Sequence, residues 1–235
     1  KYGVPTYTHA RYLSVIEPQS SFEALAEIVS LAASTGAAMH VNHLNSIATR
    51  DIPRIAELLK GAQARGLHVT TEAYPYGAGM TEIQSALFDD WRTWPEARFQ
   101  LHQLVRTGER LTRTTFATAR AEGGTIIIHG RSEAQTRAAI ASPLSMIASD
   151  GFIENGRGHP RTSGSYAKVL GKYVRDERAL SLMDAITRMT LMPARRLEGR
   201  TPAMCAKGRV KVGADADFAI FDPATVIDRA TYEDA

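Results

Sequence analysis

The chain has 235 residues, of which 44% are hydrophobic and 23% are charged, so it holds enough apolar material for a globular core. Its 28 basic and 25 acidic residues give a net charge of +3, which is too balanced to indicate a nucleic-acid-binding protein. No apolar run reaches the length of a membrane span, and the single cysteine excludes an intrachain disulfide and favours a cytoplasmic protein.

Short apolar runs alternate with amphipathic segments through the first 150 residues, a pattern that predicts parallel strands joined by helices. The first helix is expected to begin at a capping box, in which Ser20 is followed three residues later by Glu23, and to end at Gly36. The predicted strands cover 4–9, 37–42, 67–73, 125–128 and 144–149, and the predicted helices cover 20–36, 51–66, 95–107 and 133–141.

Two later regions depart from this alternation. The stretch 80–122 contains an irregular, Trp- and Asp-rich sequence, and we expect an insertion or a lid there. Beyond Asp150 the pattern predicts amphipathic helices over 166–176 and 181–189 and a short helix from Pro193. From Cys205 it changes again, to short antiparallel strands predicted over 207–213 and 217–221.

Three chemistry-bearing side chains stand at the ends of predicted strands: His9, His43 and Asp150. In a β/α barrel the carboxyl ends of the strands form the rim where the chemistry takes place. Neutral imidazoles bind zinc, and a carboxylate within hydrogen-bond reach can act as a general base and acid. A single histidine on an apolar strand is more often a core residue, but this set at successive strand ends favours a metal-dependent hydrolase.

At these positions the sequence resembles the amidohydrolase superfamily and, within it, the N-acyl-D-amino-acid deacylase (D-aminoacylase) branch. Six motifs in the family's order carry the resemblance along most of the chain. They are Thr8-His9-Ala10-Arg11, Met39-His40-Val41-Asn42-His43-Leu44-Asn45, Glu72-Ala73-Tyr74-Pro75-Tyr76 with Gly79 and Thr81, Ala148-Ser149-Asp150-Gly151, His159-Pro160-Arg161 with Gly164, and Lys207-Gly208 through Asp222-Pro223.

The resemblance implies an α/β fold, namely the second half of a (β/α)8 TIM-like barrel followed by the start of a small β-sandwich domain. We therefore expect a barrel part over 1–204, with the insertion near 80–122, and an incomplete small β-domain over 205–235. It also implies a zinc-dependent enzyme, with one or two divalent metals, that hydrolyses the amide bond of an N-acyl-D-amino acid.

The resemblance also assigns roles to individual residues. His9, His43 and Asp150 would bind the metal, and Asp150 would deprotonate the metal-bound water and pass the proton to the leaving amine. Tyr76 and Arg161 match positions that contact the substrate carboxylate. Asn45 falls in the same substrate-binding set, but it stands where the family has a Lys, so an ion pair to the carboxylate would have to come from Arg161. Behind these residues, supporting roles are expected for His40, Arg11 and His159.

The family's His-x-His pair and its Cys or Glu ligand are absent from these residues and are expected before Lys1, in the missing first half of the barrel. We do not expect the 235 residues alone to be active. Two alternatives stay open: a cyclic-amide or D-dipeptide hydrolase of the same superfamily, and a non-catalytic metal-binding homologue. The expected partner is a small amide substrate, with no nucleic acid or membrane, and assembly into a homo-oligomer is open.

Overall fold

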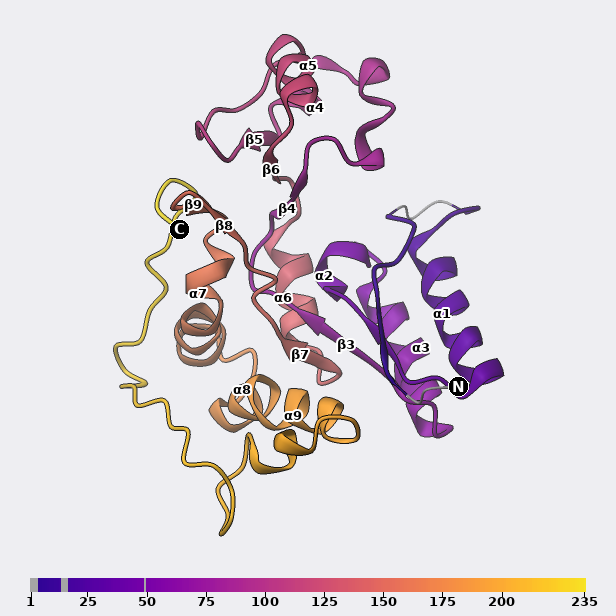
Figure 1. Cartoon of the computed structure of the whole chain (residues 1–235), viewed down its shortest axis with the longest axis vertical. Helices are drawn as coiled ribbons and strands as arrows, with labels where there is room; N and C mark the ends of the chain where they lie inside the picture. The colour runs from indigo at the N-terminus through magenta and orange to yellow at the C-terminus, as the bar shows by residue number, and fades with distance from the viewer. Residues whose placement is uncertain (1–3, 14–16, 49) are drawn as a thin grey trace.

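The computed structural model describes residues 4–13, 17–48 and 50–235. At its centre is a four-stranded parallel sheet in the order β1-β2-β3-β7, of which Figure 1 labels β3 and β7. Parallel pairing places the carboxyl ends of all the strands at one edge, so residues that follow them gather there. The strands are β1 (Thr6–Thr8), β2 (Met39–Val41), β3 (Val69–Ala73) and β7 (Ser145–Ile147).

Helices between these strands cover one face of the sheet, as the sequence pattern predicts. The helix that follows β1 begins at the predicted capping box: the Glu23 amide donates to Ser20 Oγ (3.2 Å), and the Ser20 amide donates to Glu23 Oε2 (2.7 Å). It ends at Gly36, whose φ of 68° lies in the left-handed region that glycine tolerates. The helices are α1 (Ser21–Thr35), the single turn α2 (Leu44–Ile47), α3 (Ile52–Ala64) and α6 (Glu133–Ala141).

The main hydrophobic core lies between this sheet and its helices. Leu25 of α1, Val41 of β2 and Ile55 of α3 are all fully buried in it. Burial of a side chain of this kind contributes about 1.5–3 kcal/mol relative to its exposure to water. The core therefore fixes the rim by fixing the strands that lead to it.

Residues 79–128 leave the parallel sheet and form a structure of their own, here called the excursion. Its three-stranded antiparallel sheet has the order β4-β6-β5 and lies at the top of Figure 1. A second, aromatic core that includes Trp94, Phe99 and Phe116 holds it together. The elements are β4 (Gly79–Glu82), two 3₁₀ turns (Ala86–Phe88 and Trp91–Thr93), α4 (Glu96–Phe99), β5 (His102–Leu104), α5 (Arg113–Glu122) and β6 (Thr125–Ile128).

The excursion corrects two sequence-based predictions. The helix predicted over 95–107 is wrong, because only one turn forms before the chain becomes strand β5. The predicted strand 125–128 exists, but it pairs antiparallel with β4 and β5 and does not extend the parallel sheet. Ile126 of this strand is buried in the aromatic core of the excursion. An apolar run shows that a strand is buried but not which sheet buries it.

The part of the chain after β7 is mainly helical. The predicted helices over 166–176 and 181–189 are present, although the first begins five residues earlier and its second half is a π-helix. None of the helices in the described ranges combines the length and the apolar character that a bilayer span requires. The elements are the hairpin β8 (Ile153–Glu154) and β9 (Arg157–Gly158), α7 (Arg161–Lys168), the π-helix Val169–Asp176, α8 (Leu182–Met189), α9 (Leu191–Glu198) and a 3₁₀ helix (Pro202–Ala206).

The strands predicted over 207–213 and 217–221 are absent from the structure. These residues form turns and unpaired chain, and Val212 and Ile220 are fully exposed to solvent. A short hairpin is stable only when an apolar face can pack against another element, and the described residues offer these side chains none. The small β-domain over 205–235 therefore stays a prediction.

Candidate functional site

Two imidazoles face each other where β1 and β2 end. The rings of His9 and His43 have centroids 4.7 Å apart and meet edge to face. His43 holds a left-handed backbone (φ 34°), which is uncommon for a residue with a side chain and costs energy that the surrounding structure must supply. The parallel pairing of β1 and β2 therefore accounts for their proximity, and the turn into α2 sets the direction of His43.

Both imidazoles keep a nitrogen lone pair available. His43 Nδ1 is buried and has no hydrogen-bond partner among the described residues. Burial, aided by the neighbouring His9, lowers the pKa of His43 to about 3, so the ring is neutral. His9 Nδ1 lies 2.8 Å from the Ala10 carbonyl oxygen, which can only accept, so Nδ1 is the donor of this contact and Nε2 is the nitrogen left for a ligand. Neutral imidazoles with free lone pairs suit a metal such as zinc.

The carboxylate of Asp150 follows β7 and pairs with Arg161. Arg161 Nη1 lies 2.8 Å from Asp150 Oδ2, and the arginine side chain is almost entirely buried while that of Asp150 is 39% exposed. Burial raises the pKa of Asp150, and the positive charge of Arg161 opposes that rise. Asp150 also has a left-handed backbone (φ 49°), so two of the predicted site residues occupy strained positions.

Glu72 supports His43 from behind and was not in the predicted site set. Its Oε1 accepts the His43 amide proton (3.1 Å), while Oε2 contacts His40 Nε2. His40 Nδ1 in turn lies 2.7 Å from Thr70 Oγ1. Burial raises the pKa of Glu72 to about 7 and lowers that of His40 to about 4. His40 thus acts on the site by contacting Glu72. The sequence signal for Glu72 was its place as a carboxylate at the end of a predicted strand.

Asn45 is fully buried, and its amide is occupied by the backbone of the segment Tyr74–Tyr76. Asn45 Nδ2 donates to the Tyr74 carbonyl (3.0 Å) and the Tyr76 carbonyl (3.3 Å), and Oδ1 accepts the Tyr74 amide proton (3.3 Å). Tyr76 is buried as well, and its hydroxyl donates to Asp228 Oδ2 (2.6 Å). Both residues therefore shape the rim from behind, and contact of either with a substrate stays a prediction.

Tyr74, not Tyr76, presents its side chain at the site. Its hydroxyl accepts a hydrogen bond from Arg131 Nη1 (2.9 Å), and Arg161 Cζ lies 4.4 Å from the centre of its ring. Arg131, which follows β6, has no carboxylate partner among the described residues. No sequence pattern indicates Arg131 as a site residue, because its place at the rim depends on how the chain returns from the excursion.

The other two predicted supporting residues differ in their surroundings. His159 is fully buried, with Nδ1 accepting the Arg161 amide proton (3.0 Å) and Nε2 donating to the Ala78 carbonyl (3.1 Å). Burial lowers its pKa to about 2, so this neutral ring braces Arg161. Arg11 instead forms an exposed ion pair with Glu27 of α1 at the edge of the site.

A cavity of about 1040 Å³ lies between the rim and the excursion. His9, His43, Asp150 and Arg161 line it from the rim, and its size suits a small-molecule ligand. Within the described ranges, no three His, Cys, Asp or Glu side chains come together as a metal-binding group. His9, His43 and Asp150 thus face one ligand-sized space, and their role as metal ligands stays a prediction.

The role of Asn45 can be tested through stability. Asn45→Ala is expected to lower the free energy of unfolding by about 3 kcal/mol, because three hydrogen bonds are lost and buried backbone groups are left unpaired. Asn42→Ala is the control, because the Asn42 side chain makes no hydrogen bond to the described residues. Urea denaturation of the full-length protein measures both variants. Equal stability of Asn45→Ala and wild type would contradict this role.

Comparison with models of protein families gives no match. The chain is 31% identical over 221 residues to the N-acyl-D-glutamate deacylase of Alcaligenes xylosoxydans xylosoxydans. The aligned region covers 89% of this chain and 44% of that protein. A solved N-acyl-D-glutamate deacylase from Bordetella bronchiseptica, complexed with zinc and a phosphonate mimic of the tetrahedral intermediate, superposes with a TM-score of 0.76. The two chains are 26% identical, and 91% of this chain and 46% of that one are covered.

A solved D-aminoacylase with a binuclear metal centre superposes with a TM-score of 0.74 at 26% identity, covering 97% of this chain and 48% of that one. The chain thus spans about half the length of the relatives it matches. These neighbours confirm the α/β amidohydrolase fold and the resemblance that the sequence motifs indicate. By sequence and by fold, the chain is similar to the N-acyl-D-amino-acid deacylases, proteins of the D-aminoacylase branch of the amidohydrolase superfamily.

Proposed function

We propose that the full-length protein is a zinc-dependent hydrolase that cleaves the amide bond of N-acyl-D-amino acids. The observation that carries this proposal is the pair of facing imidazoles, His9 and His43, on the same cavity as the Asp150–Arg161 ion pair. The deacylases named above add support, since their substrates are N-acyl-D-amino acids and one of them is complexed with zinc. We also infer that the four parallel strands are the second half of the barrel and that 205–235 begins the small β-domain.

The residues present fit part of the donor set of a zinc ion. His43 offers a buried, unpartnered Nδ1, His9 offers Nε2, and the carboxylate of Asp150 opens on the same cavity. We assign these three as the chain's own contribution to the ligand set. When bound, zinc lowers the pKa of a water molecule towards about 7 and polarises the amide carbonyl.

The chain's own groups supply the proton transfers. Asp150 takes the proton of the attacking water and delivers it to the nitrogen of the leaving amine. Its carboxylate is partly exposed and can therefore act as this general base and acid. Arg161 keeps Asp150 aimed through their 2.8 Å contact, and its positive charge opposes the rise in the pKa of Asp150 that burial causes. Glu72 fixes the strained backbone of His43 by accepting its amide proton.

The substrate carboxylate meets positive charge at the cavity wall. Arg131 and Arg161 both line the cavity, and their guanidinium groups can bind a carboxylate with two parallel hydrogen bonds. Asn45 offers no charge and is occupied by backbone groups, so we assign carboxylate recognition to the arginines. The acyl group then points towards the apolar side of the excursion, where Leu87, Phe88 and Leu101 line the cavity.

Release of free amino acid from a panel of N-acetyl-D- and N-acetyl-L-amino acids, with hydrolysis of cyclic amides and D-dipeptides measured alongside, tests the proposal. The full-length, zinc-loaded protein is expected to release amino acid from D-substrates only. Turnover confined to cyclic amides or D-dipeptides would move the assignment to those alternatives. No turnover on any of these substrates, with bound zinc verified by elemental analysis, would favour a non-catalytic metal-binding homologue.

A further inference from the structure

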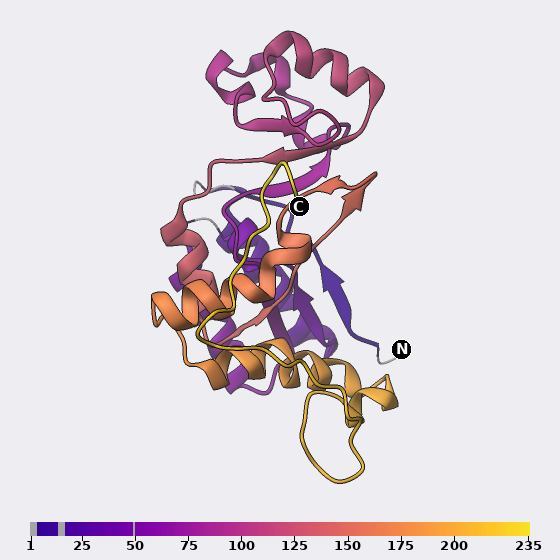
Figure 2. The same cartoon turned by 90° about the vertical axis from the view of Figure 1, so that its left-hand side faces the viewer.

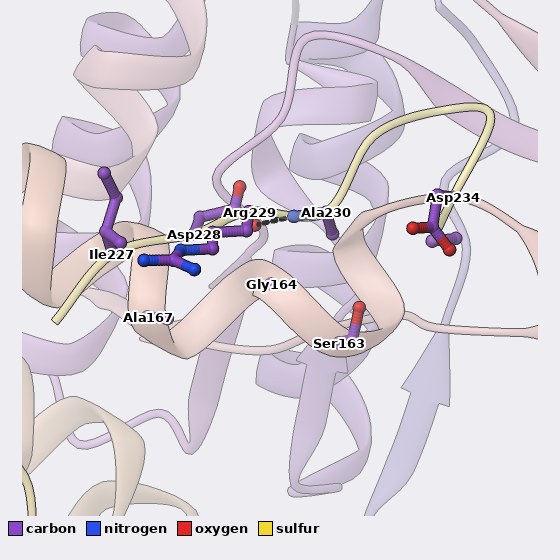
Figure 3. Close-up of a pocket in the computed structure, with 9 residues that line it drawn as sticks. Ser163, Gly164, Ala167, Ile227, Asp228, Arg229, Ala230 and Asp234 are labelled. Carbon is purple, nitrogen blue, oxygen red and sulfur yellow. Dashed lines mark hydrogen bonds between the residues drawn. The ribbon is translucent and has the colours of Figure 1, made fainter.

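The last part of the chain crosses α7 and returns to the rim of the site. In Figures 1 and 2 this segment runs alongside the helices that follow β7 and ends near β8 and β9. We name residues 226–232 the strap. Its first contact is with the π-helix: Arg175 Nη1 donates to the Val226 carbonyl (2.6 Å). Figure 3 shows the strap over the first turns of α7, with Asp228 above Gly164.

Asp228 of the strap holds Tyr76. The Tyr76 hydroxyl donates to Asp228 Oδ2 (2.6 Å), and Asp228 Oδ1 accepts the Ala230 amide proton (3.0 Å) within the strap itself. Lys168 Nζ lies 3.7 Å from the centre of the Tyr76 ring, so the ring lies between a cation and a carboxylate. A hydrogen bond to a charged acceptor is stronger than a neutral one, which makes this a firm contact.

Gly164 of α7 lies directly beside the contact between Tyr76 and Asp228, where a larger side chain would not fit. A Cβ atom at Gly164 would overlap both Asp228 Oδ1 and the Tyr76 hydroxyl oxygen. The backbone of Gly164 is helical, so space, not conformation, requires glycine here. A cavity of about 340 Å³, lined by Gly164, Asp228 and Asp234 among others, lies beside this contact (Figure 3).

Tyr232 holds the other side of the rim. Its ring lies between those of His129 and His159, with centroid distances of 4.7 and 5.0 Å. It also packs against the small apolar cluster of Ala78, Val105 and Ile127. Burial raises the pKa of its hydroxyl to about 12. One strap residue thus ties the excursion to the histidine that braces Arg161.

We propose that the strap positions the candidate site, with Asp228 and Tyr232 as its positioning residues. Asp228 fixes Tyr76, whose hydroxyl also lies 3.3 Å from the carbonyl oxygen of Pro160, the residue before Arg161. Tyr232 packs on His159, which accepts the Arg161 amide proton. Both routes end at Arg161, and neither touches His9 or His43. The kinetic consequence rests on the function proposed above, whereas the structural consequence does not.

The test is Asp228→Ala in the full-length, zinc-loaded protein. We expect zinc content to stay at the wild-type level and KM for an N-acyl-D-amino acid to rise on the order of tenfold, with a smaller change in kcat, because a displaced Arg161 holds the substrate carboxylate less well. Hydrogen exchange, which needs no turnover, should become faster in peptides that cover 74–79 and 159–164. Asp234→Asn is the control: it removes the same charge from an exposed carboxylate two residues beyond the strap.

Tyr76→Phe removes the same hydrogen bond from the other partner and keeps the ring, which guards against an Asp228 variant that does not fold. It should reproduce the KM change, and the double variant should be no worse than either single one. Wild-type KM and wild-type exchange in both single variants would overturn the proposal, as would an equal effect of Asp234→Asn. A wild-type protein that turns over no N-acyl amino acid would refute the proposed function. Hydrogen exchange in the variants would still test whether the strap positions residues 74–79 and 159–164.

Discussion

Replacing His43 with alanine in the full-length, zinc-loaded protein is expected to remove bound zinc and turnover together. The imidazole offers a buried, unpartnered nitrogen next to His9, so the substitution deletes a donor that no neighbouring group in the described ranges replaces. Loss of a residue that merely supports a ligand weakens metal binding by about 10- to 100-fold, so loss of the ligand itself should cost at least about 100-fold. Zinc retained after dialysis, measured by elemental analysis, checks this directly.

His68→Ala is the matched control, because its exposed imidazole lies before β3, at the far end from the rim. Its zinc content and turnover should equal those of the wild type. Full zinc retention by His43→Ala would remove His43 from the ligand set. Full zinc with no turnover would instead assign His43 a role in catalysis alone.

Asp150→Asn is expected to lower kcat by about 10²- to 10⁴-fold, the usual contribution of a positioned general acid–base group. The amide keeps the size of the carboxyl group and can still accept a hydrogen bond from Arg161, so the fold should be unchanged. The asparagine amide cannot take up a proton from water, so the proton transfer that the Asp150 carboxylate is proposed to carry out is lost. Steady-state kinetics on an N-acetyl-D-amino acid, with zinc content measured in parallel, gives the result.

Asp90→Asn controls for the loss of a negative charge from the same cavity. Asp90 lines the cavity from the excursion, and an asparagine oxygen could still accept the hydrogen bond from Trp94 Nε1 (2.9 Å). We expect kcat to change by less than about threefold, since this charge takes no part in proton transfer. A kcat of Asp150→Asn close to that of Asp90→Asn would exclude Asp150 as the general base.

Local signals in the sequence predicted much of the fold. The capping box at Ser20 and the glycine stop at Gly36 set the ends of α1 correctly, because both act through neighbouring backbone groups. The predicted helix 133–141 matches α6 residue for residue. The partner of strand 125–128 could not be predicted, because pairing is decided by contacts distant in the sequence. The helix predicted over 95–107 is wrong for a related reason, since residues 102–104 pair with the distant strand β6.

The candidate site was predicted in part. Strand ends are visible in a sequence, so His9, His43 and Asp150 could be placed at one rim, and the structure puts all three on one cavity. The direction of a side chain is not visible. Asn45 and Tyr76 stand at the predicted places in the sequence, but their side chains are engaged elsewhere. The Asn45 amide donates to the backbone, and the Tyr76 hydroxyl donates to Asp228. Arg131 reaches the rim only through the path of the excursion.

The antiparallel pairing of β4 with β6 has a consequence for how such a protein can diversify. Gly79 pairs with Ile128, so the chain enters and leaves the excursion at neighbouring points, and the 48 residues between these two pack on a core of their own. A module with adjacent ends can be exchanged for another while the parallel sheet keeps its register. Natural variation or laboratory grafting could therefore replace the far wall of the cavity, and with it the shape of the space that a ligand would fill, while His9, His43 and Asp150 keep their places at the rim.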